Sequence, residues 1–325
     1  MNKDSREPKI VVIGGGTGIH NLLRGLKKYT SDIVAVVTMM DSGGSSGILR
    51  DEFGQLPPGD VRQALVALSP TDRSSLVLRQ LFNYRFSKGE GLEGHSFGNL
   101  FLTALTDITG GTDKAIEEAG KILGIKGRVL PVTLTHSHLA AKLIDGTDIV
   151  GETNIDVRKE KPDVKIDYVY LDPKAYSYKP VLDEIASADV IVMGPGDLYT
   201  SIVPNLLVDG VAEAINFSKA KKVYICNLMT KHGESDGFSA SSFVKEIRSY
   251  LEGGKLDFVV VNSGILPEKI VQRYTMEKAA SVETDIDEVK KLTKNVIYKP
   301  IATAGTLLRH DTGKIARIVI DIASK

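Results

Sequence analysis

Continuous apolar runs, each followed by glycine or polar residues and then by a helical pattern, recur along the chain. The first run covers residues 9–13, and after its glycines the apolar positions are spaced three to four apart, as in an amphipathic helix. A second run, residues 33–40, completes a β-α-β unit. Because these runs lack polar alternation, we expect strands that helices cover on both faces.

Three later apolar runs repeat this pattern in the second half of the chain. They cover residues 189–193, 222–226 and 257–261, with helical stretches near 208–217 and 242–251 between them. Consecutive β-α-β units form a right-handed parallel sheet. The predicted fold class is therefore α/β and Rossmann-like, with a mainly parallel sheet and helices on both faces.

The pattern changes between the two halves. Residues from about 60 to 125 predict consecutive helices with Gly and Ser breaks, which we interpret as a helical insertion. From about 128 to 171, shorter apolar runs with turn signals predict a small antiparallel β addition. Residues 1–8 are polar and are expected to form a disordered tail, so residues 9–325 constitute a single domain.

Composition limits the classes of partner. The 325 residues include 41 Lys and Arg against 41 Asp and Glu, so no global positive field attracts nucleic acid. No stretch of about 18 apolar residues offers a membrane span, and we expect a cytoplasmic protein. Cys226 is the only cysteine, which excludes an intrachain disulfide and, within a strand run, indicates a buried inert thiol.

The residues after the first run predict an anion site. In Gly14-Gly15-Gly16-Thr17-Gly18, bare backbone leads into a helix whose first N–H groups lack intrahelical partners. Counted from Gly14, the third glycine of the dinucleotide fingerprint falls on Ile19, so a nicotinamide dehydrogenase is disfavoured. A tight structural turn is the alternative to a ligand site. The candidate residues in this loop are Gly15, Gly16, Thr17 and Gly18.

A second candidate segment follows the second run. Asp41 stands where dinucleotide folds hold a ribose hydroxyl, and its carboxylate could instead hold a divalent cation. The following glycines and serines add amide and hydroxyl donors, and Arg50 adds a positive charge. The alternative is a flexible surface loop. The candidate residues here are Asp41, Ser42, Gly43, Gly44, Ser45, Ser46 and Arg50.

Two helix starts in the insertion add further candidates. Asp60 follows a rigid Pro-Pro-Gly turn and either contacts a ligand or only caps its helix. His95 and Asn99 lie around another helix start, where the histidine is either a phosphate donor and proton carrier or a structural residue. His136 and His138 have the spacing of two metal ligands but no evident third, which favours hydrogen bonding over a metal site.

Loops after the later runs complete the set. Glycines and hydroxyls follow residues 189–193, a polar loop follows 222–226, and Asn262-Ser263-Gly264 follows 257–261. Ligands of doubly wound sheets bind outside the carboxyl ends of the strands, so we expect all these loops to converge at one edge. Near the end, Arg309-His310-Asp311 supplies a cation for a phosphate or a cap for the last helix. The candidates are Gly194, Gly196, Asp197, Tyr199, Thr200, Ser201, Asn227 and Arg309.

Taken together, these motifs resemble the gluconeogenesis factor family (YvcK-like proteins), relatives of the 2-phospho-L-lactate transferases (CofD). The matching stretches span almost the whole chain, and as a set they are specific. The transferases carry Asp-Asp-Gly-Gly-Ser-Ser-Gly where this chain has Ser42 after Asp41, so one potential carboxylate ligand is absent. The matching stretches are 14–18, 41–47, 57–60, 93–95, 98–100, 194–201 and 309–311.

The resemblance implies a cytoplasmic protein that binds a nucleotide or nucleotide-sugar and links carbon metabolism to cell-wall precursors and cell shape. A UDP-sugar is the favoured ligand, with GDP and NAD as alternatives and Mg²⁺ as an optional companion. The first hypothesis is a regulatory binding protein whose ligand-bound state is recognised by a protein partner in cell-wall or carbon metabolism. The second is a Mg²⁺-dependent phosphoryl or phosphodiester transferase. Homo-oligomerisation is left open.

Overall fold

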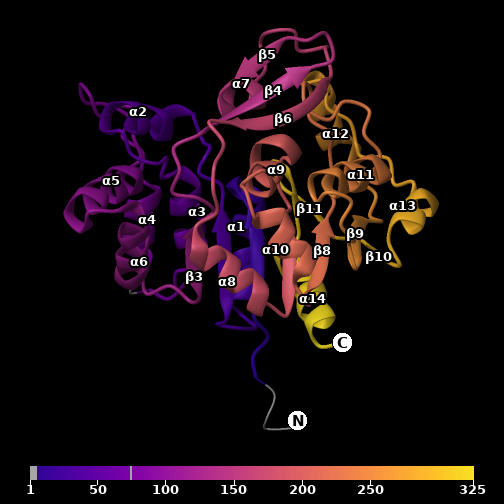
Figure 1. The fold of residues 1–325 in the computed structure, drawn as a ribbon, viewed down its shortest axis with the longest axis horizontal. Coiled ribbons are helices and arrows are strands. Elements are labelled where there is room, and N and C mark those ends of the chain that lie inside the picture. The colour runs from indigo at the N-terminus through magenta and orange to yellow at the C-terminus, as the bar shows by residue number, and fades with distance from the viewer. Residues whose placement is uncertain (1–5, 74) are drawn as a thin grey trace.

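The computed structural model describes residues 6–73 and 75–325, built around a seven-stranded parallel sheet (Figure 1). The strand order is β10-β9-β8-β7-β1-β2-β3, and every neighbouring pair is parallel. This is the common doubly wound order, and it places the switch point between β1 and β7. The strands are β1 (Ile10–Gly14), β2 (Ile33–Val37), β3 (Arg128–Pro131), β7 (Val190–Met193), β8 (Lys221–Ile225), β9 (Phe258–Asn262) and β10 (Asn295–Lys299).

Strand β1 shows why the sheet is buried on both sides. Ile10 pairs with Ile33 on one side and with Val190 on the other, and Val11 and Ile13 pack into one hydrophobic cluster. Ile10 packs with Val12 into the other cluster. All of these side chains are fully buried. The prediction of a parallel sheet that is covered on both faces is therefore confirmed.

Two groups of helices cover the sheet. One face packs against α1 (Gly16–Leu26), α3 (Gly59–Leu68), α6 (Thr112–Leu123) and α14 (Thr312–Ala323). The other packs against α8 (Lys179–Ser187), α9 (Val203–Leu206), α10 (Val211–Phe217), α11 (Ala240–Tyr250) and α13 (Ile286–Leu292). The remaining helices are α2 (Gly44–Phe53), α4 (Leu76–Asn83), α5 (Phe97–Thr109), α7 (Glu152–Asp156) and α12 (Glu268–Met276). Within the described ranges, no helix is both long and apolar enough to cross a bilayer.

The helical insertion begins earlier than the sequence indicates. Apolar strand character extends to Met40, but β2 ends at Val37, and α2 starts at Gly44 inside the stretch interpreted as a glycine loop. Gly44 has φ +42°, a conformation that glycine adopts without strain. Ser45 and Ser46 are thus buried residues of a helical first turn.

The small antiparallel β addition begins later in the chain than predicted. Residues 128–131 were expected in it, but they form β3, which pairs in parallel with β2 through Val34 and Arg128. The antiparallel sheet itself consists of β4 (His138–Leu143) between β5 (Asp148–Val150) and β6 (Ile166–Asp172), at the top of Figure 1 beside α7. A hairpin, β11 (Ala302–Ala304) and β12 (Leu308–His310), precedes α14.

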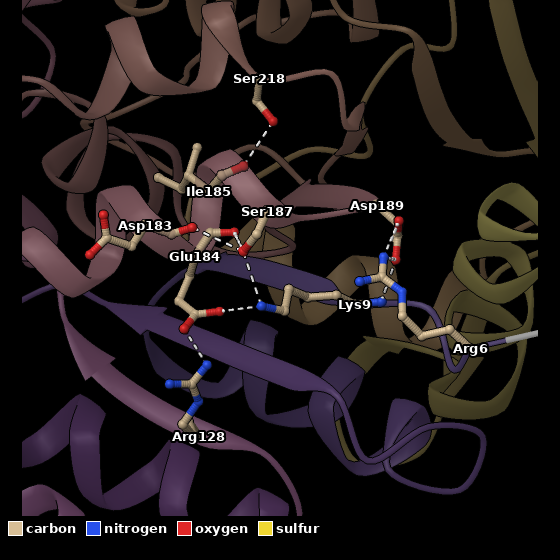
Figure 2. Close-up of polar contacts among 9 residues, drawn as sticks. All are labelled: Arg6, Lys9, Arg128, Asp183, Glu184, Ile185, Ser187, Asp189 and Ser218. Atoms are coloured by element: carbon tan, nitrogen blue, oxygen red, sulfur yellow. Dashed lines mark hydrogen bonds and ion pairs between the residues drawn. The ribbon is translucent and has the colours of Figure 1, made fainter.

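Ion pairs connect the segments at the amino-terminal ends of β1, β3 and β7 (Figure 2). Lys9 Nζ lies 2.9 Å from Glu184 Oε2 in α8, and the other oxygen of Glu184 pairs with Arg128 at the start of β3. Arg6 pairs with Asp189 at 2.8 Å. Residues 1–5 of the expected disordered tail lie outside the described residues, whereas Arg6 is tied to the sheet through this pair.

Candidate functional site

A cleft of about 790 Å³ opens at the carboxyl ends of the central strands. The loops after β1, β7 and β8 line it, together with the segment after β2, α7, α12 and the β11–β12 hairpin. The sequence prediction that separate loops share one edge is therefore met by the geometry. The predicted site residues that line the cleft are Gly15, Gly16, Thr17, Gly18, Asp41, Asp60, Gly196, Asp197, Thr200, Ser201, Asn227 and Arg309.

Glycine backbone forms the floor of the cleft, at the start of α1. A Cβ on Gly18 would lie 2.1 Å from the Pro195 carbonyl oxygen, so only glycine lets the two loops pack this closely. Gly16 has φ +62°, and a Cβ there would meet nothing nearer than Ser201 Oγ at 3.6 Å. Backbone amides at a helix start that faces the cleft are elements of an anion site, and one of them, the Gly16 N–H, already donates to the Asp60 carboxylate.

Acidic residues gather at one end of the cleft. Asp60 does not cap its own helix: its Oδ1 accepts a 2.9 Å hydrogen bond from Gly16 N–H. Burial and the nearby Asp41 raise the pKa of Asp60 to about 7, and burial and Asp41 raise the pKa of Glu152 to about 8. A Cβ on Gly59 would lie 2.3 Å from Asp41 Oδ2, so glycine makes room for this carboxylate.

This acidic end suits a divalent cation. Mg²⁺ prefers one or two carboxylates together with phosphate oxygens and waters. Asp41 and Asp60 supply two carboxylates, and a cation held by them would offset the burial and the repulsion that raise the pKa of Asp60. The residues present therefore fit the metal that the transferase hypothesis requires.

A lysine lies within a second acidic cluster, of which Asp156 and Asp197 line the cleft and Glu234 is buried. Asp156, Asp197 and Glu234 each offer a carboxylate oxygen, and these oxygens lie within 4.8 Å of one another. Lys231 Nζ lies 2.8 Å from Asp197 Oδ2 and 2.9 Å from Glu234 Oε1, and it also pairs with Asp156. Burial raises the pKa of Glu234 to about 8, and the surrounding carboxylates raise the pKa of Lys231 above its usual value. The single ammonium group thus offsets part of the negative charge of these carboxylates.

The carboxyl-terminal segment closes one side of the cleft. Arg309 on β12 lines it, while Asp311 caps α14 by accepting hydrogen bonds from Gly313 and Lys314 N–H. Of the two roles considered for this motif, the helix cap belongs to Asp311, and Arg309 is the residue in position to supply a cation. His310 Nε2 donates to the Cys226 carbonyl oxygen at 3.0 Å, and burial lowers the pKa of His310 to about 4.

The other predicted site residues do not line the cleft. Tyr199 is buried, its hydroxyl donates to Glu246 Oε1 at 2.8 Å, and it does not line the cleft. Arg50 pairs with Asp51 and lines a separate cavity of about 170 Å³ beside His136 and His138. The predicted residues that do not line the cleft are Ser42, Gly43, Gly44, Ser45, Ser46, Arg50, His95, Asn99, Gly194 and Tyr199.

A buried hydrogen-bond network explains several of these. His95 Nδ1 lies 3.2 Å from Ser45 Oγ, and Asn99 Nδ2 donates to Ser45 and Ser46 Oγ at 3.3 Å. Arg62 Nε donates to Asn99 Oδ1 at 2.9 Å. The network joins the starts of α2 and α5, which gives His95 the structural role that the sequence left as an alternative.

Several cleft residues were not predicted. Glu152 and Asp156 lie on the five-residue helix α7, which has no periodic sequence signal, and Tyr274 lies on α12. Lys231 lies in the same polar loop as Asn227. Its position in a loop that follows a strand was the signal by which the sequence could have indicated it as a site residue. Gln63 lies one turn after Asp60, on the same side of α3. Once Asp60 is assigned to the site, this helical spacing indicates Gln63 as a further site residue.

The fold and the cleft define a doubly wound α/β protein with a polar site at the switch point of its sheet. The family model described as 2-phospho-L-lactate transferase CofD matches residues 10–302. A "Putative gluconeogenesis factor" of Thermoanaerobacterium thermosulfurigenes is 45% identical over 318 residues, covering 97% of each chain. The chain belongs to the gluconeogenesis factor family, within the wider CofD family.

Two further similarities agree with this assignment. The "Gluconeogenesis factor" of Bacillus subtilis is 43% identical over 319 residues, covering 98% of each chain. A crystal structure of a UPF0052 family protein from Bacillus halodurans superposes with a TM-score of 0.91 at 42% identity, covering 97% of this chain and 100% of that one. The fold predicted from sequence is therefore also that of a solved relative.

Proposed function

We propose that this protein is a cytoplasmic regulator that binds a nucleotide-sugar, with a UDP-sugar as its ligand, and links carbon metabolism to cell-wall precursor supply and cell shape. The observation that carries the proposal is the glycine floor at the start of α1, where Gly15, Gly16 and Gly18 line the cleft beside the Gly196 loop. A diphosphate fits such a floor because amides and the helix dipole neutralise its charge. Arg309, which also lines the cleft, adds a cation.

The arrangement of the walls supports a regulatory role. The cleft is lined by α7 from the antiparallel unit, by α12 and by β12, as well as by the loops of the main sheet. A ligand that contacts all of these elements favours the conformation in which they are close together. A protein partner in cell-wall or carbon metabolism can then bind selectively to that conformation. The name of the B. subtilis relative supports the link to carbon metabolism.

A Mg²⁺-dependent phosphoryl or phosphodiester transferase is the second candidate. The pair Asp41 and Asp60, together with the match to the transferase family model, favours it. When bound, Mg²⁺ would neutralise charge on the phosphates. Asp41 and Asp60 would hold the ion, and the amides of the glycine floor would orient the phosphate. Ser42 removes one carboxylate of the transferase motif, which is why binding without transfer is preferred.

A thermal-unfolding panel tests the proposal. UDP-sugars, GDP and NAD are added with and without Mg²⁺, and a ligand at 100 times its dissociation constant adds about 2.7 kcal/mol of stability. We expect UDP-sugars to give the largest shift, and a panel without any shift would contradict both candidate functions. The bound sugar is then incubated for hours with candidate acceptors. An unchanged ligand supports the regulator, whereas turnover supports the transferase.

A further inference from the structure

A second cavity of about 380 Å³ lies beside the cleft, at the carboxyl ends of β8, β9 and β10. The fifth polar loop of the sequence, Asn262-Ser263-Gly264, lines it but does not line the cleft. Asn227 and Leu228 line both cavities, so the two spaces adjoin across the loop after β8.

The walls of the second cavity differ chemically from those of the cleft. Leu228, Val261, Val271, Val282 and Tyr298 make them largely apolar, with an aromatic ring on one side. Among the described residues that line it, Glu268 is the only one with a charge, whereas the cleft has charged groups at both ends. Such a cavity suits an uncharged, flat group with some hydrogen-bonding edges.

The polar residues of the cavity divide into a structural one and others available to a ligand. Asn262 Oδ1 accepts from Ile301 N–H at 3.0 Å, and its Nδ2 donates to the Gly264 carbonyl oxygen at 2.8 Å. The Asn262 amide therefore fixes the loop. The hydroxyls of Ser263 and Ser281 supply the polar contacts that a ring edge needs.

Helix α12 forms a wall of both spaces and is itself poorly covered. Val271 lines the second cavity, Tyr274 lines the cleft, and no residue of α12 is buried. Ile265, just before the helix, is fully exposed. Helices gain most of their stability from packing an apolar face. A ring bound against Val271 would supply that packing.

The positions along the edge give the order of the ligand's parts. From β9 to β2 the sheet runs through β8, β7 and β1, which is four strand spacings or about 19 Å. We propose that the second cavity binds the nucleobase of the nucleotide ligand, with the diphosphate on the glycine floor and the hydroxyl-bearing sugar toward Asp41. This inference rests on the proposed function.

A blocking variant tests the assignment. Val271→Trp fills the second cavity, and Gln272→Trp, at the neighbouring exposed position, is the matched control because it lines neither space. UDP and inorganic pyrophosphate, up to millimolar concentration, are titrated into both variants and the unaltered protein. We expect Val271→Trp to weaken UDP binding at least tenfold and to change pyrophosphate binding less than twofold.

Three results would count against it in different ways. Equal UDP affinity in the two variants, or equal weakening of UDP and pyrophosphate by Val271→Trp, overturns the nucleobase site while the proposed function stands. If neither probe binds the unaltered protein, the proposed function fails as well.

A reporter variant keeps the test valid if Val271→Trp does not fold. The chain has no tryptophan, so Tyr298→Trp places a single tryptophan, excited selectively over the remaining tyrosines, in the wall of the cavity. UDP is expected to quench its emission with the affinity found by calorimetry, and pyrophosphate is not. UDP binding by calorimetry without any change in emission overturns the assignment.

Discussion

Asp60 connects the glycine floor of the cleft with its acidic end. Its carboxylate accepts the Gly16 N–H, yet it lies near Asp41 and is buried, which raises its pKa to about 7. Near neutral pH this group is therefore partly protonated. A bound cation, or a change of pH, alters its charge at the point where a phosphate is expected.

Asp60→Asn separates the hydrogen bond from the charge. The amide oxygen still accepts the Gly16 N–H, but the repulsion with Asp41 disappears. On going from pH 5 to pH 8, we expect the variant to lose less stability than the unaltered protein, by on the order of 2 kcal/mol. Urea unfolding at both pH values measures this. Identical pH dependence in the two proteins would show that Asp60 is not charged in this way.

Arg309→Ala tests the cation at the carboxyl-terminal side of the cleft. Charge-assisted hydrogen bonds to phosphate are worth about 1.5–3 kcal/mol, so a UDP-sugar should bind roughly tenfold or more weakly. Arg309→Lys should recover part of the affinity. Arg317→Ala, an exposed ion-paired arginine on α14, is the control with unchanged binding. Calorimetric titration gives the values, and unchanged affinity in Arg309→Ala would place the phosphates elsewhere.

Some site residues could be predicted one by one, and others could not. Gly15 to Gly18 carry a local signal because glycines directly follow an apolar run. Tyr199 and Thr200 are neighbours in one motif, but only Thr200 lines the cleft. A short π-helical turn, Leu198–Ile202, sets which side chain points inward, and no spacing rule in the sequence reveals that turn.

At the scale of elements, Lys231 holds three parts of the molecule together. Its ammonium group pairs with Asp156 on α7, Asp197 after β7 and Glu234 in its own loop. The antiparallel unit is thereby joined to the main sheet across the cleft. Glu234 is almost completely buried, so its ionised form depends most on this counter-charge.

Lys231→Met removes that counter-charge. We expect a loss of roughly 2 kcal/mol in the free energy of unfolding, below the usual cost of breaking a buried pair because Asp156 and Asp197 are partly solvated. Adding Glu234→Gln should restore part of the loss. Urea unfolding of the single and double variants measures both effects. A single variant as stable as the unaltered protein would mean that the lysine does not join these elements.

The elements also show where sequence patterns reach their limit. The apolar runs of the main sheet predicted their strands because continuous burial is a local property of the residues. Strand β3 has the same short apolar character as β4, so its parallel pairing with β2 could not be distinguished from an antiparallel partner. Helix α2 was missed because glycines and serines dominate its first turn.

At the scale of the whole molecule, strand order decides where the site lies. The sequence predicted that several loops share an edge, but only the order β2-β1-β7-β8 makes them neighbours around the switch point. Pairing of β1 with β7 joins segments far apart in the chain, and this depends on packing between distant residues.

The stability of the molecule should fall as the pH rises from about 4 to 8. Asp60, Glu152 and Glu234 have pKa values of about 7, 8 and 8 in the folded protein, against 3.8, 4.5 and 4.5 when unperturbed. Burial lowers the pKa values of His20 and His310, and these two groups oppose the trend, but the three carboxyls leave the folded state with more bound protons in this range, so deprotonation favours unfolding. Urea unfolding at one-unit pH steps tests this, and stability that rises steadily to pH 8 would contradict it.

A crystal structure of the protein with a UDP-sugar bound tests the central claim most directly. The account predicts ligand density in the cleft at the switch point, with the diphosphate on the amides of the Gly15 to Gly18 loop and within reach of Arg309. Density for the diphosphate at any other place, or an empty cleft at ligand concentrations that saturate the protein in solution, would contradict it.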